Sequence, residues 1–348
     1  MASSLIFVLS VSFAASAAIT WVWVQIARRY HVIDQPNARG AHSHPTPRGG
    51  GIAIVLVSVA AFLAFAPHFS SHDDSLFFVV SLGGLAVGIL GVLDDLYSLR
   101  ARYRFATQLA IAACSVYALP ELPQLPVIGL VDWPSWLVFC AAVLSIVWSI
   151  NLFNFMDGIN GLAGSEAIFV LLGAVLILVV SGQHSDLGML IVVVGAVLGF
   201  LVFNFPNAKV FMGDSGSCFL GYVIAIFALG SSGSDSISPW SWVILYGVFV
   251  VDTTVTLLVR IVTKQKWYLP HNLHAYQKLA RAQGSHARVT SMIFIVNVVW
   301  CLPLAVLATL FSDYSFLIVM IALIPITIGV VKLDGGRLSI EPTSLQNG

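Results

Sequence analysis

Four aspartates are the side chains of this chain best suited to chemistry: Asp94, Asp95, Asp157 and Asp214. Asp94 and Asp95 end a long apolar run and precede a basic stretch, in GVLDDLYSLRARYR. Two solvated acids at a helix end are the simpler interpretation of that pair taken alone. A helix C-terminus disfavours negative charge, however, so a compensating arginine or metal ion is expected nearby. Clustered carboxylates predict Mg²⁺ with phosphate substrates, because Mg²⁺ takes one or two carboxylates and completes its shell with water and phosphate oxygens.

A second polar segment, NLFNFMDGINGLAG at residues 151–164, interrupts another apolar run. Asn151, Asn154 and Asp157 recur every third residue, so a helix would present them along one face. Gly158 and the glycines after it allow backbone amides to approach a ligand closely. A glycine-capped helix end is the alternative, but three polar groups in an apolar span carry a desolvation cost unless they are partnered. We therefore expect this segment to bind a polar substrate.

A third segment, NFPNAKVFMGDSGS at residues 204–217, places Asp214 between glycines at the expected start of a helix. Phe211 precedes this aspartate by three residues and offers an aromatic ring. A simple N-cap for the next helix explains Ser215 equally well. An N-cap explains the combination of Asp214, its neighbouring glycines and Phe211 less well. Asp214 is therefore a candidate oxygen ligand for a metal ion.

Two further segments carry histidines. In WYLPHNLHAYQKLAR, His271 and His274 are three residues apart and are expected to share one face of a helix, where they suit phosphate oxygens or a metal. In RGAHSHPTPRGGG, the donors are His42, His44 and Arg48. Contact with lipid headgroups at the membrane surface is an alternative role for this basic segment.

The elements that must position these residues are membrane helices. The chain is 58% hydrophobic and 9% charged, with a mean hydropathy of +0.93, which excludes an ordinary soluble domain. The net charge is zero, so no nucleic-acid partner is predicted. The four cysteines are scattered through apolar segments, which argues against a disulfide framework or a zinc site.

A helix needs about 20 apolar residues to cross a bilayer. We therefore predict an all-α, polytopic membrane protein with about 11 transmembrane helices in a single domain, residues 1–348. The predicted spans are 4–27, 49–67, 76–93, 105–119, 135–153, 164–181, 187–204, 217–232, 240–260, 291–311 and 316–331.

The charges predict how these spans are oriented. All 16 Lys and Arg residues fall in alternate loops or in the C-terminal tail, and the opposite loops contain only acids. By the positive-inside rule, the N-terminus is periplasmic and the C-terminus cytoplasmic. The predicted catalytic loops, all cytoplasmic, are about 28–48, 94–104, 151–164, 204–217 and 260–290.

These five segments, in this order and on one side of the membrane, resemble the polyprenyl-phosphate N-acetylhexosamine-1-phosphate transferases, which are glycosyltransferase family 4 enzymes of the phospho-MurNAc-pentapeptide translocase type. The resemblance covers about residues 28–290, and PTPRGGG with LPHNLHAYQ is most similar to the branch that initiates lipopolysaccharide O-antigen synthesis. It implies a bacterial inner-membrane enzyme that converts a UDP-N-acetyl sugar and undecaprenyl phosphate to undecaprenyl-diphospho-sugar and UMP. The implied cofactor is Mg²⁺, with Mn²⁺ as an alternative.

The resemblance also implies roles for individual residues. Asp94 aligns or deprotonates the lipid phosphate, and Asp214 binds the metal ion together with Asp94. Phe211 stacks on uracil. The implied catalytic residues are Asp94, Asp95, Asp157, His271 and His274. The implied substrate-binding residues are Asn151, Asn154, Gly158, Asn160, Phe211, Arg48, Arg102 and Arg104.

The chain departs from the family pattern at three positions. Two family lysines fall at Ser43 and Ser98, so Arg48 or Arg100 is expected to supply the missing charge. The second acid of the family's DGxDG motif is Asn160. These departures leave open which N-acetyl sugar is used and how the phosphates are held.

Other functions are compatible with part of this pattern. A secondary transporter would use Asp252 and Asp157 as ion sites. Asp252, about 12 Å into the ninth predicted span at 1.5 Å per residue, is alternatively a partner of the basic cluster. A non-catalytic lipid-binding scaffold would need the basic loops but not the carboxylates. Direct attack or a phospho-enzyme, and a monomer or a homodimer, are equally compatible with the sequence.

Overall fold

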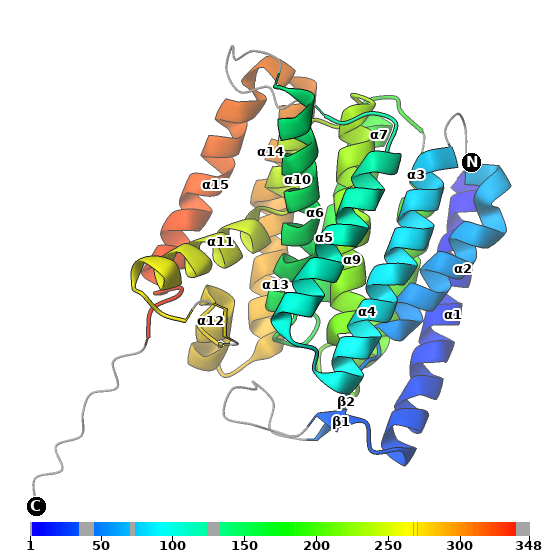
Figure 1. Ribbon diagram of the computed structural model, residues 1–348, viewed down its shortest axis with the longest axis vertical. Helices are drawn as coiled ribbons and strands as arrows, with labels where there is room; N and C mark the ends of the chain where they lie inside the picture. The colour runs from blue at the N-terminus through cyan, green and yellow to red at the C-terminus, as the bar shows by residue number, and fades with distance from the viewer. Residues whose placement is uncertain are drawn as a thin grey trace, which may run out of the picture.

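The fold is almost entirely helical, as predicted. A computed structural model of the protein describes residues 2–34, 45–69, 74–123, 133–184, 186–266, 268–269 and 271–338. Most of the helices run along the long axis of the molecule (Figure 1). Among the described residues, the only sheet is the antiparallel pair β1 (Ile33–Asp34) and β2 (Thr46–Pro47).

The helices follow the apolar runs of the sequence. They are α1 (Ala2–Arg29), α2 (Ile52–Phe69), α3 (Asp74–Phe78), α4 (Gly84–Tyr97), α5 (Ala101–Ala118), α6 (Ser135–Met156), α7 (Leu162–Val180), α8 (Leu187–Asn204), α9 (Gly213–Gly233), α10 (Pro239–Leu245), α11 (Gly247–Val262), α12 (Ala275–Gln283), α13 (His286–Val296), α14 (Leu302–Leu310) and α15 (Ser315–Lys332). Single π-helical turns join α3 to α4 and α13 to α14.

The multi-pass character of the chain is confirmed. Each of the predicted spans coincides with one helix or with successive helical segments. Eight described helices are long and apolar enough to cross a membrane, or nine if the bent pair α10 and α11 counts as one span. Helices α2 and α5 are not among these, so the count of eleven and the orientation of the termini stay predictions.

The ninth predicted span, 240–260, is not one continuous helix. Its two halves, α10 and α11, meet at an angle of 77°, and α11 lies across the other helices (Figure 1). The hydroxyl group of Tyr246, at the break, lies 3.1 Å from that of Ser149 on α6. Gly247 follows it, and a Cβ atom there would lie 3.1 Å from Leu323. The bend depends on these tertiary contacts, which hydropathy does not encode.

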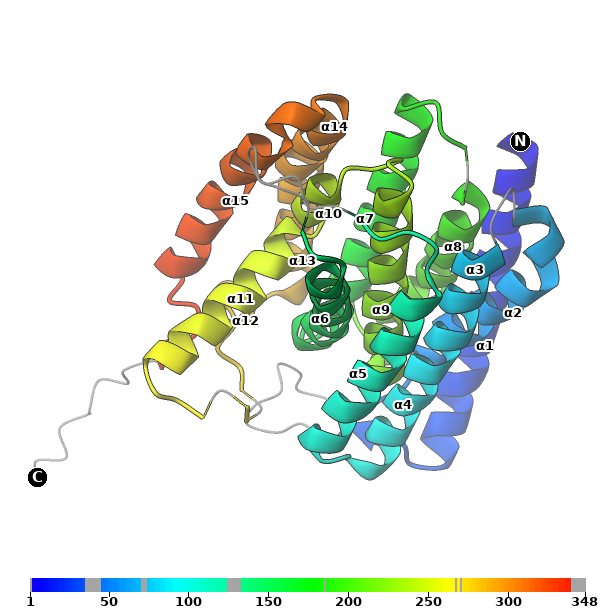
Figure 2. The same cartoon turned by 45° about the horizontal axis from the view of Figure 1, so that its top comes forward.

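Helix α9 is the centre of the bundle. It is the most buried of the eight long apolar helices, with 83% of its apolar window buried, and α4 and α6 pack against it (Figure 2). Small residues permit this approach: a Cβ atom on Gly221 would lie 2.4 Å from the carbonyl oxygen of Ser149, and one on Gly91 of α4 would lie 2.5 Å from the carbonyl oxygen of Asp214. The last turn of α4 is therefore in direct contact with the first turn of α9.

The predicted functional segments gather at one end of the bundle. The C-terminal ends of α4 and α6, the start of α9, the strand pair and α12 all lie at the lower end of Figure 1. Helix α1 starts at the opposite end, and α15 finishes at the lower end. The loops that carry chemistry in the sequence are thus brought to a single surface.

Candidate active site

Asp94 and Asp95 lie in the last turn of α4, and their carboxylates have different partners. Asp94 accepts a hydrogen bond from the backbone N–H of Leu99 at 2.8 Å. Asp95 accepts from the backbone N–H groups of Asp214, at 3.1 Å, and Ser215, at 3.3 Å. Asp95 therefore caps the start of α9, where helical N–H groups lack partners within the helix. This contact fixes Asp214 next to the aspartate pair.

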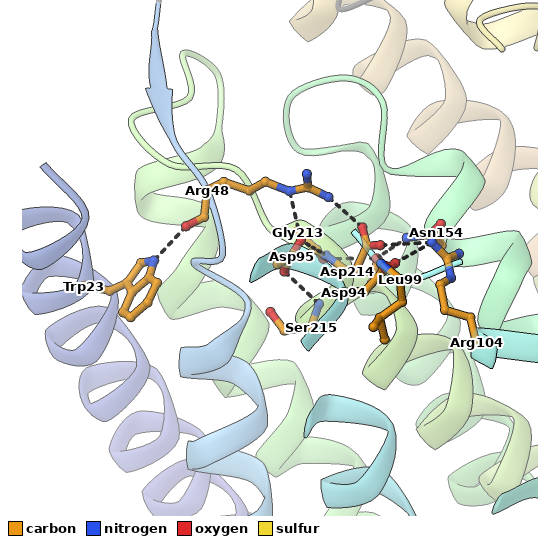
Figure 3. A network of polar contacts seen from close by, with 11 residues as sticks. Trp23, Arg48, Asp94, Asp95, Leu99, Arg104, Asn154, Gly213, Asp214 and Ser215 are labelled. Atoms are coloured by element: carbon orange, nitrogen blue, oxygen red, sulfur yellow. Dashed lines mark hydrogen bonds and ion pairs between the residues drawn. The ribbon is translucent and has the colours of Figure 1, made fainter. Parts of the chain in front are cut away.

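Two arginines pair with the three carboxylates (Figure 3). Nε of Arg48 lies 2.9 Å from Asp95, and its Nη2 lies 2.9 Å from Asp214. Nη1 of Arg104 contacts Asp94 and lies 3.4 Å from Asp214. The cation expected beside the end of α4 is therefore supplied by both arginines, one from the segment before α2 and one from α5.

The other arginines near this end lie outside the cluster. Arg102 is exposed, and its guanidinium group lies 4.8 Å from the ring centre of its neighbour Tyr103. Arg100 is exposed as well. The structure thus brings Arg48 and Arg104 to the acids but not Arg102, whose role in substrate binding stays a prediction.

The cluster of Asp94, Asp95, Asp214, Arg48 and Arg104 shifts pKa values. Two of the affected groups are Arg48 itself and the neighbouring Asp157. Burial alone lowers the pKa of Arg48, but the carboxylates of Asp95 and Asp214 outweigh it and raise that pKa above its usual value. Burial raises the pKa of Asp157 well above that of an ordinary carboxyl group, and the negative charge of Asp214 raises it further. The positive charge of Arg48 lowers the Asp157 pKa, as does a backbone hydrogen bond from Gly213. Asp157 therefore belongs to the same electrostatic unit as Asp214.

The asparagines predicted to bind substrate face neighbouring helices. Helix α6 extends to Met156, three residues beyond the predicted span, so Asn151 and Asn154 lie in its last two turns. Asn151 donates to Gln108 of α5 at 2.8 Å. Asn154 donates to Ser217 of α9 at 3.3 Å, one turn after Asp214. Asn154 therefore lies beside the acid cluster, whereas Asn151 packs against α5.

The loop after α6 connects the site to the rest of this end. Gly158 is exposed in this loop. Asn160 donates to the backbone carbonyl of Pro206 at 3.1 Å, and Thr290 donates to the carbonyl of Asn160 at 2.9 Å. Asn160 thus joins the loop to the segment before α9 and to α13, and it makes no contact with the acid cluster among the described residues.

Phe211 lies in a segment paired with the Arg48 segment. Its backbone N–H donates to the carbonyl of Pro47 at 2.8 Å, and its carbonyl accepts from Gly50 at 2.9 Å. These bonds place the PTPRGGG and FMGD motifs side by side, although they are far apart in the sequence. His42 and His44 lie outside the described residues.

The prediction that His271 and His274 share a helical face is wrong. His274 is the residue before α12, and His271 precedes the helix altogether. Their rings nevertheless stack, with centres 4.9 Å apart and planes at 28°. The ring of Phe155, from α6, lies 6.2 Å from that of His274. The histidines thus adjoin the end of α6.

The residues suit a Mg²⁺ ion that shares its coordination with substrate. Within the described ranges, no three His, Cys, Asp or Glu side chains form a metal cage. Mg²⁺ usually needs only one or two carboxylates, however. Asp94 and Asp214 already flank one cationic group, Nη1 of Arg104. These two aspartates are therefore the residues able to hold the ion.

Three polar residues of this site are not among the predicted functional residues. Gln108 and Ser217 hold the two asparagines of α6. Asn204 accepts from the backbone N–H of Gly161 at 2.7 Å and so joins α8 to the loop after α6. The available hint was that Asn204 and Gln108, like the aspartates, are polar residues at the edges of apolar runs.

Comparison with known proteins relates this geometry to a family. Residues 77–232 match the model of glycosyl transferase family 4. The chain is 31% identical, over 90% of its length and 88% of the relative's, to a probable undecaprenyl-phosphate N-acetylglucosaminyl 1-phosphate transferase of Bacillus subtilis.

Other relatives have related names. A phospho-N-acetylmuramoyl-pentapeptide-transferase of Geobacillus kaustophilus is 33% identical over 73% of this chain and 82% of the relative. A decaprenyl-phosphate N-acetylglucosaminephosphotransferase of Mycobacterium leprae is 30% identical over 78% of this chain and 75% of the relative. The site of this chain is a cluster of acids and arginines at one end of a helix bundle. By its similarity to these relatives, the chain belongs to glycosyl transferase family 4 and is a phosphotransferase of that family.

Proposed function

We propose that the protein transfers an N-acetylhexosamine-1-phosphate from a UDP-sugar to undecaprenyl phosphate, with Mg²⁺, and releases UMP. The observation that carries this proposal is the meeting of Asp94, Asp95 and Asp214 with Arg48 and Arg104 between α4 and α9. Both substrates are anionic, so their reaction mainly requires positioned positive charge. The names of the relatives support a sugar phosphate donor and a prenyl phosphate acceptor.

An apolar cavity supports a lipid acceptor. It has a volume of about 420 Å³ and lies between α6, α9, α10 and α11. Its lining is almost wholly apolar and includes Ala141, Trp148, Ala225 and Trp242. Leu152 lines the cavity half a turn before Asn154, which contacts α9 beside the acids. A prenyl chain in this cavity would have its phosphate at the charged end of the bundle.

The proposed roles follow from the contacts of each residue. Arg48 and Arg104 offset two of the three carboxylate charges and lie where substrate phosphates would arrive. Asp94, which Arg104 contacts, aligns the lipid phosphate. Asp95 holds the start of α9. Mg²⁺, when bound by Asp94 and Asp214, would neutralise charge on the diphosphate.

We place the site at the cytoplasmic face of the bacterial inner membrane, because the loops that form it carry Lys and Arg residues, as cytoplasmic loops do. The sugar is an N-acetylhexosamine, for instance GlcNAc, FucNAc or QuiNAc, and the lipid product initiates O-antigen or another envelope polysaccharide. A panel of UDP-sugars given to the purified protein distinguishes these donors.

The deciding assay supplies purified protein with undecaprenyl phosphate, radiolabelled UDP-sugar and Mg²⁺. The enzyme is expected to form labelled lipid and release UMP, and Asp214→Ala is expected to lose both activities. Asp313→Ala, an exposed acid between α14 and α15, is the matched control and should retain them. Absence of labelled lipid with every UDP-sugar would contradict the proposal.

A further inference from the structure

Asp252 is a buried acid in the middle of α11. Only 2% of its surface is exposed. A carboxyl group at such a position needs partners, because an unpaired charge in an apolar interior is costly. Four donors surround it: Thr256 Oγ1 at 3.1 Å, Ala275 N at 3.0 Å, Tyr276 N at 2.9 Å and His274 Nδ1 at 3.2 Å. With its oxygens engaged in this way, Asp252 is an anchor, which weighs against its use as the ion site of a transporter.

Two of these donors belong to the first turn of α12. The N–H groups of a first helical turn have no partner within the helix, and this end carries partial positive charge. Asp252 accepts from those of Ala275 and Tyr276, which are more than twenty residues away in the chain. The start of α12 is thereby attached to the middle of α11.

The same carboxylate sets the state of His274. This histidine is 3% exposed, and its Nδ1 faces Asp252. A carboxylate only accepts hydrogen bonds, so Nδ1 carries a hydrogen, and in the neutral ring Nε2 keeps a free electron pair. The ring also accepts a hydrogen bond from the backbone N–H of Gln277, in a capping box at the start of α12. Asp252 and the first turn of α12 therefore both hold the ring in place.

The attachment of α12 also reaches the loop after α6. The hydroxyl group of Tyr276 donates to the carbonyl oxygen of Phe155 at 2.9 Å. A Cβ atom on Gly158 would lie 2.1 Å from that hydroxyl, so only glycine permits this approach. The loop between these residues carries Asp157, one of the predicted catalytic groups. The position of α12 is thus coupled to the position of Asp157.

We propose that Asp252 is a positioning residue for the transfer reaction, an inference that rests on the proposed function. It holds His274 as the Nδ1–H tautomer and sets the distance between this histidine and the Asp157 loop. It touches no substrate itself. Its action resembles that of carboxylates that fix the tautomer and orientation of a histidine through one ring nitrogen.

Two variants test the proposal by kinetics. Asn at position 252 offers one acceptor oxygen where Asp offers two, so either His274 or the N–H of Tyr276 loses its partner. We expect Asp252→Asn to lower kcat by about 10- to 100-fold while KM for undecaprenyl phosphate stays within about 2-fold. Thr256→Val is the control: it removes one donor to the same carboxylate but leaves α12 attached, and it should keep kcat within about 3-fold.

A spectroscopic measurement tests the histidine directly. In protein labelled with ¹⁵N-histidine, the ring nitrogen shifts report the tautomer, and His274→Gln assigns the signal. The Nδ1–H form is expected in the wild type, and a population of the Nε2–H form is expected in Asp252→Ala. Thermal unfolding of each variant checks that it is folded.

Three results would overturn the proposal: a wild-type kcat in folded Asp252→Asn, an equal loss of kcat in Thr256→Val, or an unchanged tautomer in folded Asp252→Ala. Absence of transfer by the wild-type protein would instead contradict the proposed function. The tautomer comparison would still decide whether Asp252 sets the state of His274.

Discussion

A methyl group added at Gly91 tests whether the contact between α4 and α9 builds the active site. Gly91 lies one turn before Asp95, and its Cβ position is 2.5 Å from both the carbonyl oxygen of Asp214 and Cα of Ser215. Ordinary contact begins at 3.4 Å, so Gly91→Ala requires the two helices to separate by about 0.9 Å. The backbone atoms on both sides cannot yield as a flexible side chain would.

The expected effect has two parts. Overpacking of a close contact costs about 1 to 3 kcal/mol of stability. A displacement of about 1 Å between catalytic groups lowers turnover by about 100-fold. The separation lies between Asp94 and Asp214, the predicted metal ligands, so we expect the apparent affinity for Mg²⁺ to fall together with kcat.

The assay compares labelled lipid formation, the Mg²⁺ dependence of the rate and thermal unfolding in the wild type and the variant. Gly329→Ala in α15 is the matched control, because nothing lies within 4 Å of its Cβ position. Alanine is favoured over glycine within a helix by about 0.5 to 1 kcal/mol, so this control should be active and no less stable than the wild type. A folded Gly91→Ala protein with wild-type kcat and Mg²⁺ dependence would show that the contact between α4 and α9 does not set the geometry of the site.

Two further predictions use other parts of the site. Ala141→Trp places a large ring in the apolar cavity from an exposed position. It should raise KM for undecaprenyl phosphate at least about 5-fold and leave KM for the UDP-sugar unchanged. Equal effects on both KM values would argue against a lipid in the cavity. Arg48→Gln removes the positive charge that lowers the Asp157 pKa. The pKa of Asp157 should then rise. If activity needs the Asp157 carboxylate, the acid limb of the kcat/KM profile should move to higher pH. An acid limb that stays in place would contradict the coupling between Arg48 and Asp157.

The sequence predicted which charged residues meet at this site better than it predicted their geometry. The adjacent acids Asp94 and Asp95 at a helix end predicted a nearby arginine or metal ion, and Arg104, expected to bind substrate, contacts Asp94. The two acids nevertheless differ in role, because Asp95 caps a helix that begins more than a hundred residues later. Local sequence does not specify such a pairing.

Periodicity misled where the backbone is not helical. The spacing of His271 and His274 predicted a shared helical face, but α12 begins only after His274. Asp252 holds that helix start from another segment, which fixes where the helix begins. Similarly, hydropathy located residues 240–260 in the membrane but did not predict the bend after Tyr246, which depends on packing against α6 and α15.

The most direct test of a carboxylate-bound metal at this site is lipid labelling during removal and return of the ion. Labelled lipid formation by the wild type should cease with EDTA and recover when Mg²⁺ is added in excess. Asp214→Asn, which keeps the shape of the side chain, should remain inactive at every Mg²⁺ concentration. Labelling that continues undiminished in EDTA, or a fully active Asp214→Asn protein, would contradict a metal-dependent transfer at this site.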